Sequence, residues 1–157
     1  MIDEEDNKGP LVRWITCRLG GETYGIEVKQ VREILRINNI LPVPGAPDCV
    51  VGITNIRGNV VTVIDGRRRL SLPACELTDA ARMIVLETSD EVAATIVDSV
   101  SDVMDLPASA IDANPKLNAR EDAHYISGVI SHDAGLIIIL NVDRFISDQH
   151  ADMVVGF

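Results

Sequence analysis

Short apolar runs alternate with polar turns along most of the chain, and many of the turns contain glycine, asparagine or aspartate. Paired runs joined by such turns predict β-hairpins, because these residues tolerate the positive φ that tight turns require. The predicted hairpins join 11–19 with 22–28, 50–56 with 60–64, 82–87 with 92–97, and 125–130 with 136–140. In the second hairpin, Gly58 and Asn59 are expected to take positive φ and to place Arg57 at the tip.

A different spacing interrupts the strands after the first hairpin. Val28, Val31 and Ile34 recur every three residues, which predicts a single helical turn. The proline-rich stretch 42–47 then predicts a stiff loop, because proline lacks a backbone donor and restricts the residue before it.

The two halves of the chain match each other when one is displaced along the other. A shift of 76 residues lays Gly52 on Gly128, and a shift of 69 lays Val31 on Val100. Chance agreement between Val- and Ile-rich runs is the alternative explanation. A repeat of about seventy residues predicts two small β-barrels, because barrel closure removes exposed strand edges. The groove between them would be lined by the segments around Val31 and Val100.

Composition supports a mainly β fold and limits the partners. Apolar residues make up 46% of the chain but aromatic residues only 3%, so the core consists mainly of Val, Ile and Leu, which favour strands. The net charge of −10 repels phosphates and anionic lipids, which argues against nucleic acid and bare membrane as partners. No segment reaches the roughly 18 apolar residues of a membrane span, so a cytoplasmic protein without membrane insertion is predicted.

The sequence contains no motif for phosphate cradling, zinc proteolysis or nucleophile-elbow hydrolysis. The remaining titratable groups are interpreted as exposed loop histidines and a solvated acidic edge, namely His124, His132 and His150, and Asp98, Asp102 and Asp105. Cys17, Cys49 and Cys75 form no C-x-x-C pair, which favours reduced thiols. We therefore predict no catalytic residue, no metal site and no cofactor.

Two basic features stand out in this acidic chain. Arg67, Arg68 and Arg69 are either a surface turn that balances nearby carboxylates or a contact patch for an acidic partner. Arg57 would present its planar donors to a partner's carboxylate or carbonyl groups, and an exposed hairpin arginine is the plainer alternative.

Several segments, in this order and spacing, resemble the CheW-type family of chemotaxis coupling proteins over nearly the whole chain. The segments are Tyr24-Gly25-Ile26-Glu27-Val28, Val31-Arg32-Glu33-Ile34, Pro44-Gly45-Ala46-Pro47, and 51–58, 97–103, 125–129 and 138–143. The resemblance implies two SH3-like five-stranded β-barrels. We expect a flexible acidic tail over 1–10, a CheW-like domain over 11–147 and a tail over 148–157. The barrels are expected at about 11–70 and 82–147, with exchange of strands or termini between them left open.

The resemblance also implies an adaptor without an active site. Such an adaptor couples the cytoplasmic tip of a methyl-accepting chemotaxis receptor to the regulatory domain of a CheA-type histidine kinase, and is recruited to membrane receptor arrays through these partners. Carried over position by position, the receptor-binding residues are Val31, Glu33, Gly52, Asn55, Arg57, Gly58, Val100 and Val103. A helical hairpin is expected to dock on the valines, oriented by Arg57 and Glu33.

The chain departs from the family pattern at several positions. Thr62 stands where proline is common, Gly66 where leucine is common, and Ala94 and Ser99 where glycine is frequent. The edge used for kinase contacts is therefore expected to differ, and no kinase-contact residue is carried over. A rival interpretation is a small-molecule-binding or thiol enzyme that uses the cleft between the barrels, with Cys49 or a histidine as the reactive group.

Overall fold

The computed structural model describes residues 9–113, 124–133 and 135–147, and strands dominate these ranges. The strands are β1 Leu11–Leu19, β2 Glu22–Glu27, β3 Val31–Leu35, β4 Val50–Ile56, β5 Asn59–Asp65, β6 Arg82–Glu87, β7 Val92–Val97, β8 Ser99–Pro107, β9 Ile126–His132 and β10 Gly135–Leu140. The helical segments are η2 Val28–Gln30, α1 Gly66–Arg69, η3 Ala108–Ala110 and residues 142–147. Within the described ranges, no helix is long and apolar enough to cross a membrane.

All of the predicted hairpins are present as antiparallel pairs, β1 with β2, β4 with β5, β6 with β7, and β9 with β10. The turn of the β4–β5 hairpin differs from the prediction by one residue. Its central residues are Arg57 and Gly58, with φ of 52° and 85°. Asn59 was expected in the turn, but it begins β5 and pairs with Ile56. Arg57 itself therefore has the left-handed conformation that asparagine or glycine usually supplies.

Two further segments differ from the sequence-based expectation. The helical turn that begins at Val28 ends at Gln30, and Val31 already belongs to β3, whose backbone pairs with β6. The other is β8, which was not predicted as a strand. Because β8 lies at a sheet edge and Ser101, Asp102 and Val103 are all exposed, its sequence lacks a regular alternation of apolar and polar residues.

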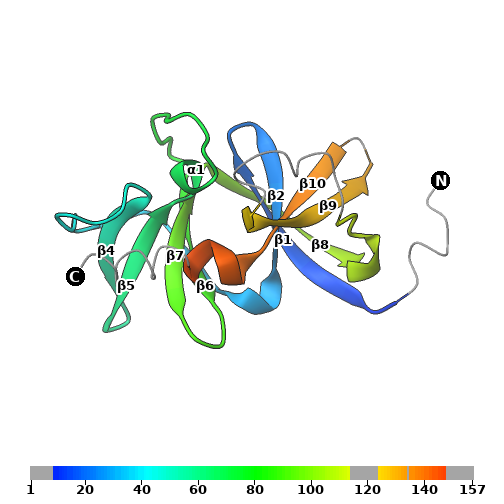
Figure 1. Cartoon of the computed structure of the whole chain (residues 1–157), viewed down its shortest axis with the longest axis horizontal. Coiled ribbons are helices and arrows are strands. Elements are labelled where there is room, and N and C mark those ends of the chain that lie inside the picture. Colours follow the sequence, from blue (N-terminus) through cyan, green and yellow to red (C-terminus); the bar gives the residue numbers. More distant parts are fainter. Residues whose placement is uncertain (1–8, 114–123, 134, 148–157) are drawn as a thin grey trace.

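The strands form two five-stranded sheets, in the orders β8-β1-β2-β10-β9 and β3-β6-β7-β5-β4, and Figure 1 shows them side by side as two SH3-like barrels. The expected division into 11–70 and 82–147 does not describe these sheets. Strands β1 and β2 join β8, β9 and β10 in the first sheet, whereas β3 to β7 form the whole of the second. The chain thus exchanges its first two strands between the halves, as the sequence had left open.

The two sheets have the same order when they are compared strand by strand. The order β8-β1-β2-β10-β9 of the first sheet corresponds, strand by strand, to the order β3-β6-β7-β5-β4 of the second. In each sheet the third and fourth strands form the parallel pair. The first barrel is therefore a circular permutation of the second. This correspondence confirms the internal repeat, because it matches β8 to β3 and β9 to β4, as the two shifts require.

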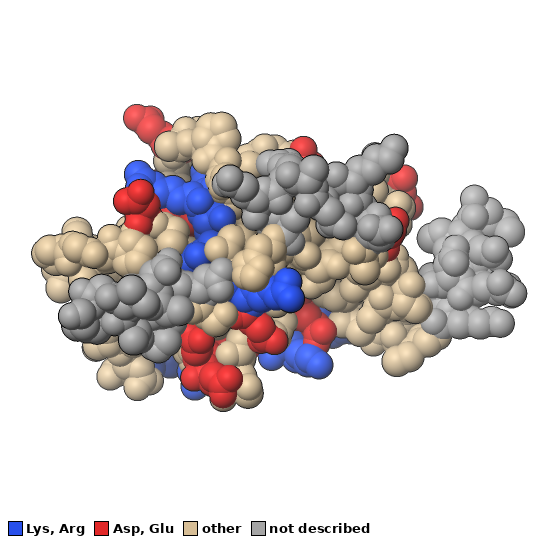
Figure 2. All heavy atoms as spheres, in the orientation of Figure 1, with Lys and Arg blue, Asp and Glu red and all other residues tan. Residues whose placement is uncertain are grey.

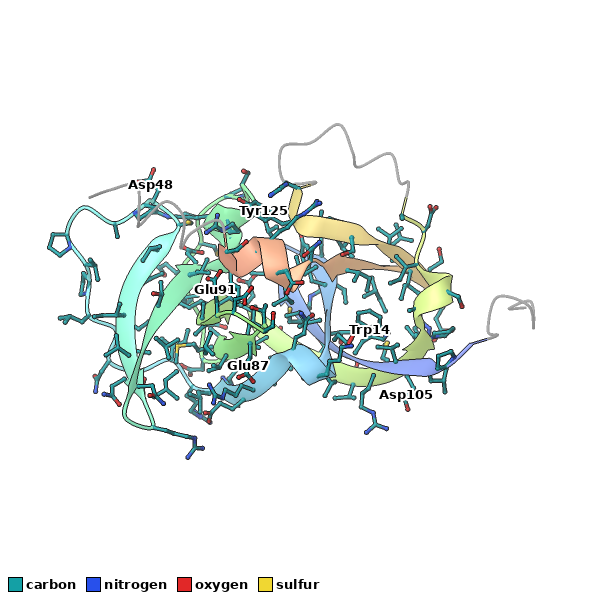
Figure 3. The ribbon with its side chains drawn as sticks, turned by 60° about the horizontal axis from the view of Figure 1, so that its bottom comes forward. Trp14, Asp48, Glu87, Glu91, Asp105 and Tyr125 are labelled. Carbon is teal, nitrogen blue, oxygen red and sulfur yellow. The ribbon has the colours of Figure 1, made fainter. Side chains whose placement is uncertain are left out.

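Among the described residues, the apolar core has three parts. One cluster lies inside each barrel, with Trp14, Ile130, Ile137 and Ile139 in the first and Val63, Met83 and Val85 among the residues of the second. Figure 3 shows Trp14 enclosed by the strands of the first barrel. The third and largest cluster, here called the central cluster, contains Cys17, Tyr24, Ile84, Leu86 and Phe145 among others, and so joins both sheets to residues 142–147. The barrels share this core and pack as one unit.

Candidate functional site

An ion pair links the two edge strands of the second sheet. Arg57 Nε and Nη2 donate to the two carboxylate oxygens of Glu33, each at 3.1 Å. Glu33 lies on β3 at one edge, and Arg57 follows β4 at the other. Hydrogen bonding to Glu33 raises the pKa of the Arg57 guanidinium, which is 78% exposed in its side chain. This ion pair therefore holds the exposed Arg57 side chain in one direction. It also joins β3 to the end of β4, two strands that are separated in the sequence.

The backbone around Arg57 is held by its neighbours in the hairpin. The Asn55 side-chain oxygen accepts a hydrogen bond from the Gly58 backbone N–H at 3.0 Å, which closes the turn. Gly58 has a φ of 85°, which favours glycine, and Arg57 and Gly58 are both exposed. Three of the predicted site residues therefore form one structural unit, in which Asn55 and Gly58 position Arg57.

The predicted valines lie at bulges in the two corresponding edge strands. On β3 the register shifts between Val31 and Glu33, and on β8 an extra residue lies between Val100 and Val103. Thr16 stabilises the second bulge by hydrogen bonding the Asp102 backbone N–H and carbonyl through its hydroxyl, at 3.0 and 3.2 Å. β-Bulges redirect side chains and are common beside functional sites. Both barrels thus bend their edge strand at the same place.

The side chains at these bulges have different environments. Val31 and Val100 are partly buried and both pack against the central cluster, so they lie at the junction of the barrels. Val103 is 60% exposed and points to solvent. Val31 and Val100 therefore both contribute to the apolar contact between the barrels, whereas Val103 is exposed on β8.

Glycine is required at position 52 for a structural reason that the sequence did not indicate. It is buried, and a Cβ built at this position would collide with the Leu41 carbonyl oxygen. The Leu41 segment crosses β4 here, and Leu41 and Ile53 exchange hydrogen bonds of 2.8 and 2.9 Å. Gly52 accordingly serves the crossing of the backbone rather than presenting a contact surface.

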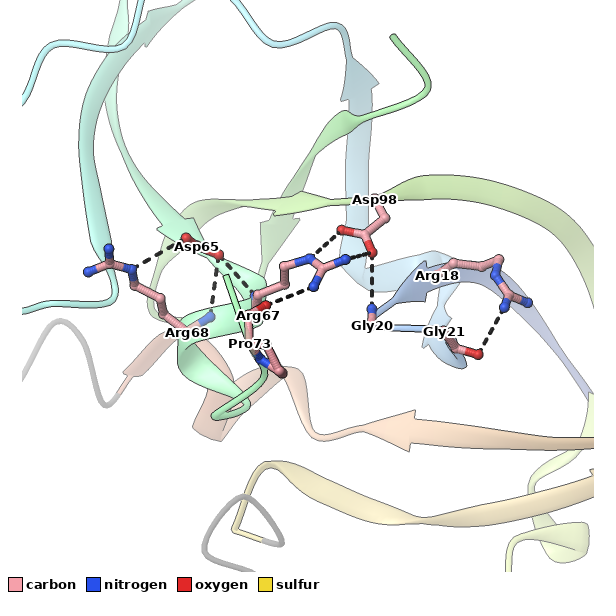
Figure 4. Close-up of polar contacts among 8 residues, drawn as sticks. All are labelled: Arg18, Gly20, Gly21, Asp65, Arg67, Arg68, Pro73 and Asp98. Carbon is pink, nitrogen blue, oxygen red and sulfur yellow. Dashed lines mark hydrogen bonds and ion pairs between the residues drawn. The ribbon is translucent and has the colours of Figure 1, made fainter. Parts of the chain in front are cut away.

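The three arginines after β5 do not form one exposed patch. Arg67 Nε and Nη2 bind the Asp98 carboxylate at 2.9 and 2.6 Å, and Asp98 also accepts the Gly20 N–H at 3.0 Å (Figure 4). This arrangement ties α1 to the β1–β2 turn of the other barrel. Only Arg68 is exposed, and it pairs with Asp65 at 3.7 Å. On the face in Figure 2, basic side chains gather over α1 beside acidic ones, as expected for a turn that balances carboxylates.

Arg69 is the least accessible of the three, with 7% exposure. Its Nη1 donates to the Tyr125 hydroxyl at 3.0 Å, and its guanidinium lies 5.2 Å from the centre of the Tyr125 ring. Tyr125 lies near α1 at the junction of the barrels in Figure 3 and makes an edge contact with Phe145. The burial of Arg67 and Arg69 therefore does not support a joint partner patch. These two act between the barrels, whereas Arg68 is exposed and pairs within its own barrel.

The other reactive groups are dispersed. Cys17 is buried, and desolvation followed by the Asp98 charge raises the pKa of its thiol to about 12. Asp105 pairs with Arg13 on the outside of the first barrel, and His132 lies 3.3 Å from Asp133. In the described ranges no three His, Cys, Asp or Glu side chains converge as metal ligands. His150 lies outside these ranges.

Comparison with known proteins gives a consistent result. The family model "CheW-like domain" matches residues 13–150. The chain is 29% identical to the chemotaxis protein CheW of Bacillus subtilis, over 91% of this chain and 92% of the relative. It is also 29% identical to the protein FrzA of Myxococcus xanthus, over 87% of this chain and 86% of the relative.

A solved structure agrees with the fold. The crystal structure of the scaffolding protein TtCheW from Thermoanaerobacter tengcongensis aligns with a TM-score of 0.77 at 27% identity, covering 85% of this chain and 90% of that chain. The shared two-barrel architecture and the matched length lead to one conclusion, that this chain belongs to the CheW-like family of chemotaxis proteins.

Proposed function

We propose that this protein is a non-enzymatic adaptor that couples the cytoplasmic tip of a chemoreceptor to the regulatory domain of a CheA-type histidine kinase. The observation that carries the proposal is the pair of bulged edge strands, β3 and β8, whose Val31 and Val100 both pack against the central cluster. Val31 lies two residues before Glu33, which pairs with Arg57. Family membership supplies the chemosensory context. The adaptor is recruited to membrane receptor arrays through these partners.

The proposed receptor surface combines two kinds of contact. Val31, Val100 and the exposed Val103 offer apolar area to an amphipathic helical hairpin, which would bury its aliphatic side chains there. Arg57 is held by Glu33 but remains exposed, so it orients the partner through its free donors. Gly52, Asn55 and Gly58 act indirectly, because they shape β4 and the turn that carries Arg57.

The coupling proposal is tested by reconstitution with purified components. The protein is incubated with a CheA-type kinase and with a receptor cytoplasmic fragment from the same cell, separately and together, and kinase autophosphorylation is measured. Binding to both partners with receptor-dependent kinase control is the expected result. Binding to neither folded partner would exclude the coupling role and direct attention to another signalling system or to the rival cleft enzyme.

Substitutions at Val31 test the receptor surface itself. Val31→Asp is expected to weaken receptor binding more than Val31→Ala, because a carboxylate would be buried against apolar partner atoms without a hydrogen-bonding group. Affinity for the receptor fragment is measured for both variants, and a thermal melt verifies that each is folded. If both substitutions reduce affinity equally, Val31 does not lie at the contact.

A further inference from the structure

A polar pocket lies at the far end of β3, away from the bulge. It encloses about 290 Å³ and is formed by Arg36, Ile37, Leu77, Thr78, Asp79, Ala81 and Arg82, which we call the arginine pocket. Ligand pockets for small molecules and cofactors usually range from about 300 to 1,000 Å³, so this one is of a size for side chains of a peptide. None of its residues belongs to the proposed receptor surface.

Two like charges line this pocket from the ends of neighbouring strands. The β3–β6 ladder pairs Ile34 with Ile84 and Leu35 with Met83. Arg36 directly follows β3 and Arg82 begins β6, so both lie next to this last pair and line the pocket. Like charges in one pocket repel each other, and an anion between them would reduce that repulsion.

Among the described residues, these two guanidinium groups lack the carboxylate partners that five other arginines have, as Arg18, Arg69 and Arg144 also do. Arg13, Arg32, Arg57, Arg67 and Arg68 each pair with a carboxylate. Arg82 instead donates through Nη1 to the Asp79 and Ala81 backbone carbonyls, at 2.9 and 2.7 Å. No carboxylate of the described residues forms an ion pair with Arg36 or Arg82. The Asp79 carboxylate lies on the same wall, which leaves the pocket with an excess of positive charge.

Apolar surface adjoins this positive charge. Leu77 is 51% exposed on the pocket wall, and Ile34 is 37% exposed on β3 two residues before Arg36. In a chain with a net charge of −10, a local excess of arginine beside exposed aliphatic side chains complements a ligand that is both acidic and apolar. A phosphate ion would use the arginines but leave Leu77 uncovered.

We propose that the arginine pocket is a docking site for an acidic segment of a protein partner. A carboxylate of that segment lies between Arg36 and Arg82, and a neighbouring aliphatic side chain packs on Leu77. This inference does not depend on the receptor site, because the two surfaces share no residue.

The test uses the full-length protein and defined probes. The isotope-labelled protein is titrated by NMR with a capped peptide of sequence Ala-Leu-Glu-Leu-Ala, with its Leu-Gln-Leu counterpart, and with inorganic phosphate. The acidic peptide is expected to shift the Arg36 and Arg82 side-chain signals and to bind at least about tenfold more tightly than the glutamine peptide, a difference of about 1.4 kcal/mol.

Arg36→Gln and Arg32→Gln form a matched pair for this titration, because they remove the same charge, one from β3 and the other from the residue that follows it. Arg32 is 3.9 Å from Glu87 and does not line the pocket. Arg36→Gln should weaken peptide binding about tenfold, and Arg32→Gln by less than about twofold. Equal losses in the two variants, equal binding of both peptides, or no binding of the acidic peptide would overturn the proposal. Phosphate binding as tightly as the acidic peptide would assign the pocket to free anions instead.

Discussion

At the scale of single residues, the Glu33–Arg57 pair carries the strongest prediction. Arg57→Glu should reduce receptor affinity about tenfold or more, because it reverses a charge that the partner meets and places two carboxylates together. The fold should persist, since Arg57 is exposed at a hairpin tip. Surface-bound receptor fragment and a thermal melt provide the two measurements.

The double variant Glu33→Arg with Arg57→Glu separates two roles of this pair. It restores an ion pair within the protein but exchanges the positions of the positive and the negative charge. If the partner recognises the charge of Arg57, affinity stays low in the double variant. Recovery of affinity would instead mean that the ion pair acts only by joining β3 to the β4–β5 turn.

The cysteines also differ at this scale. With its pKa raised to about 12 by burial and by Asp98, Cys17 has about one thiolate in ten thousand molecules at pH 8. A maleimide reagent should label the exposed Cys75 in the native protein and reach Cys17 only in denaturant, as read by peptide mass mapping. Labelling of native Cys17 at the rate of Cys75 would contradict its burial. Rapid labelling of Cys49 would favour the rival thiol enzyme.

At the scale of elements, the repeat is visible in how each barrel is closed. Leu41 crosses β4 at Gly52, and Asp112 crosses β9 at Gly128, each with a pair of backbone hydrogen bonds to the next residue of the strand. A Cβ on Gly128 would lie 2.5 Å from the Asp112 carbonyl oxygen, too close for the crossing to stay in place. Gly52 and Gly128, which the shift of 76 residues aligned in the sequence, are thus required for the same physical reason.

Gly128→Ala should therefore destabilise the protein by about 1–3 kcal/mol through overpacking. At this chain length each kcal/mol lowers the melting temperature by about 2–4 °C. Gly135→Ala is the matched control on the paired strand, because nothing lies within 4 Å of a Cβ built there, and it should change stability by less than about 0.5 kcal/mol. Calorimetric melting gives both values, and equal stability of the two variants would refute the crossing argument.

The elements also show where sequence reasoning succeeded. Hairpins were predictable because their pairing is local and most of their turns contain glycine, as at Gly20-Gly21 and Gly58. Strand β8 was not, because its pairing with β1 is distant in sequence and its edge position allows consecutive exposed residues such as Ser101 and Asp102. The Glu33–Arg57 contact was missed for the same reason, although both residues were selected individually.

At the scale of the whole molecule, the assignment of strands to barrels was not available from the sequence. It depends on the two parallel pairs, β2 with β10 and β5 with β7, which no turn connects. The repeat predicted two units but could not show that the first one is circularly permuted. Asp98 illustrates the consequence, because one carboxylate joins Arg67 of the second barrel to Gly20 of the first.

This topology predicts the effect of a truncation. A division of the barrels into residues 11–70 and 82–147 would predict the opposite effect. Removing residues 1–27 deletes β1 and β2, two of the three inner strands of the first sheet, and leaves β8 without its strand partner. Amide protection should then be lost in β9 and β10, although they are far away in sequence, and retained longest in β4 and β5. Removing only residues 1–9 should leave the amide protection of both pairs of strands unchanged. Hydrogen exchange read by NMR measures this. If β4 and β5 lose protection while β9 and β10 keep it, the barrels follow the sequence order, and the exchange of strands is wrong.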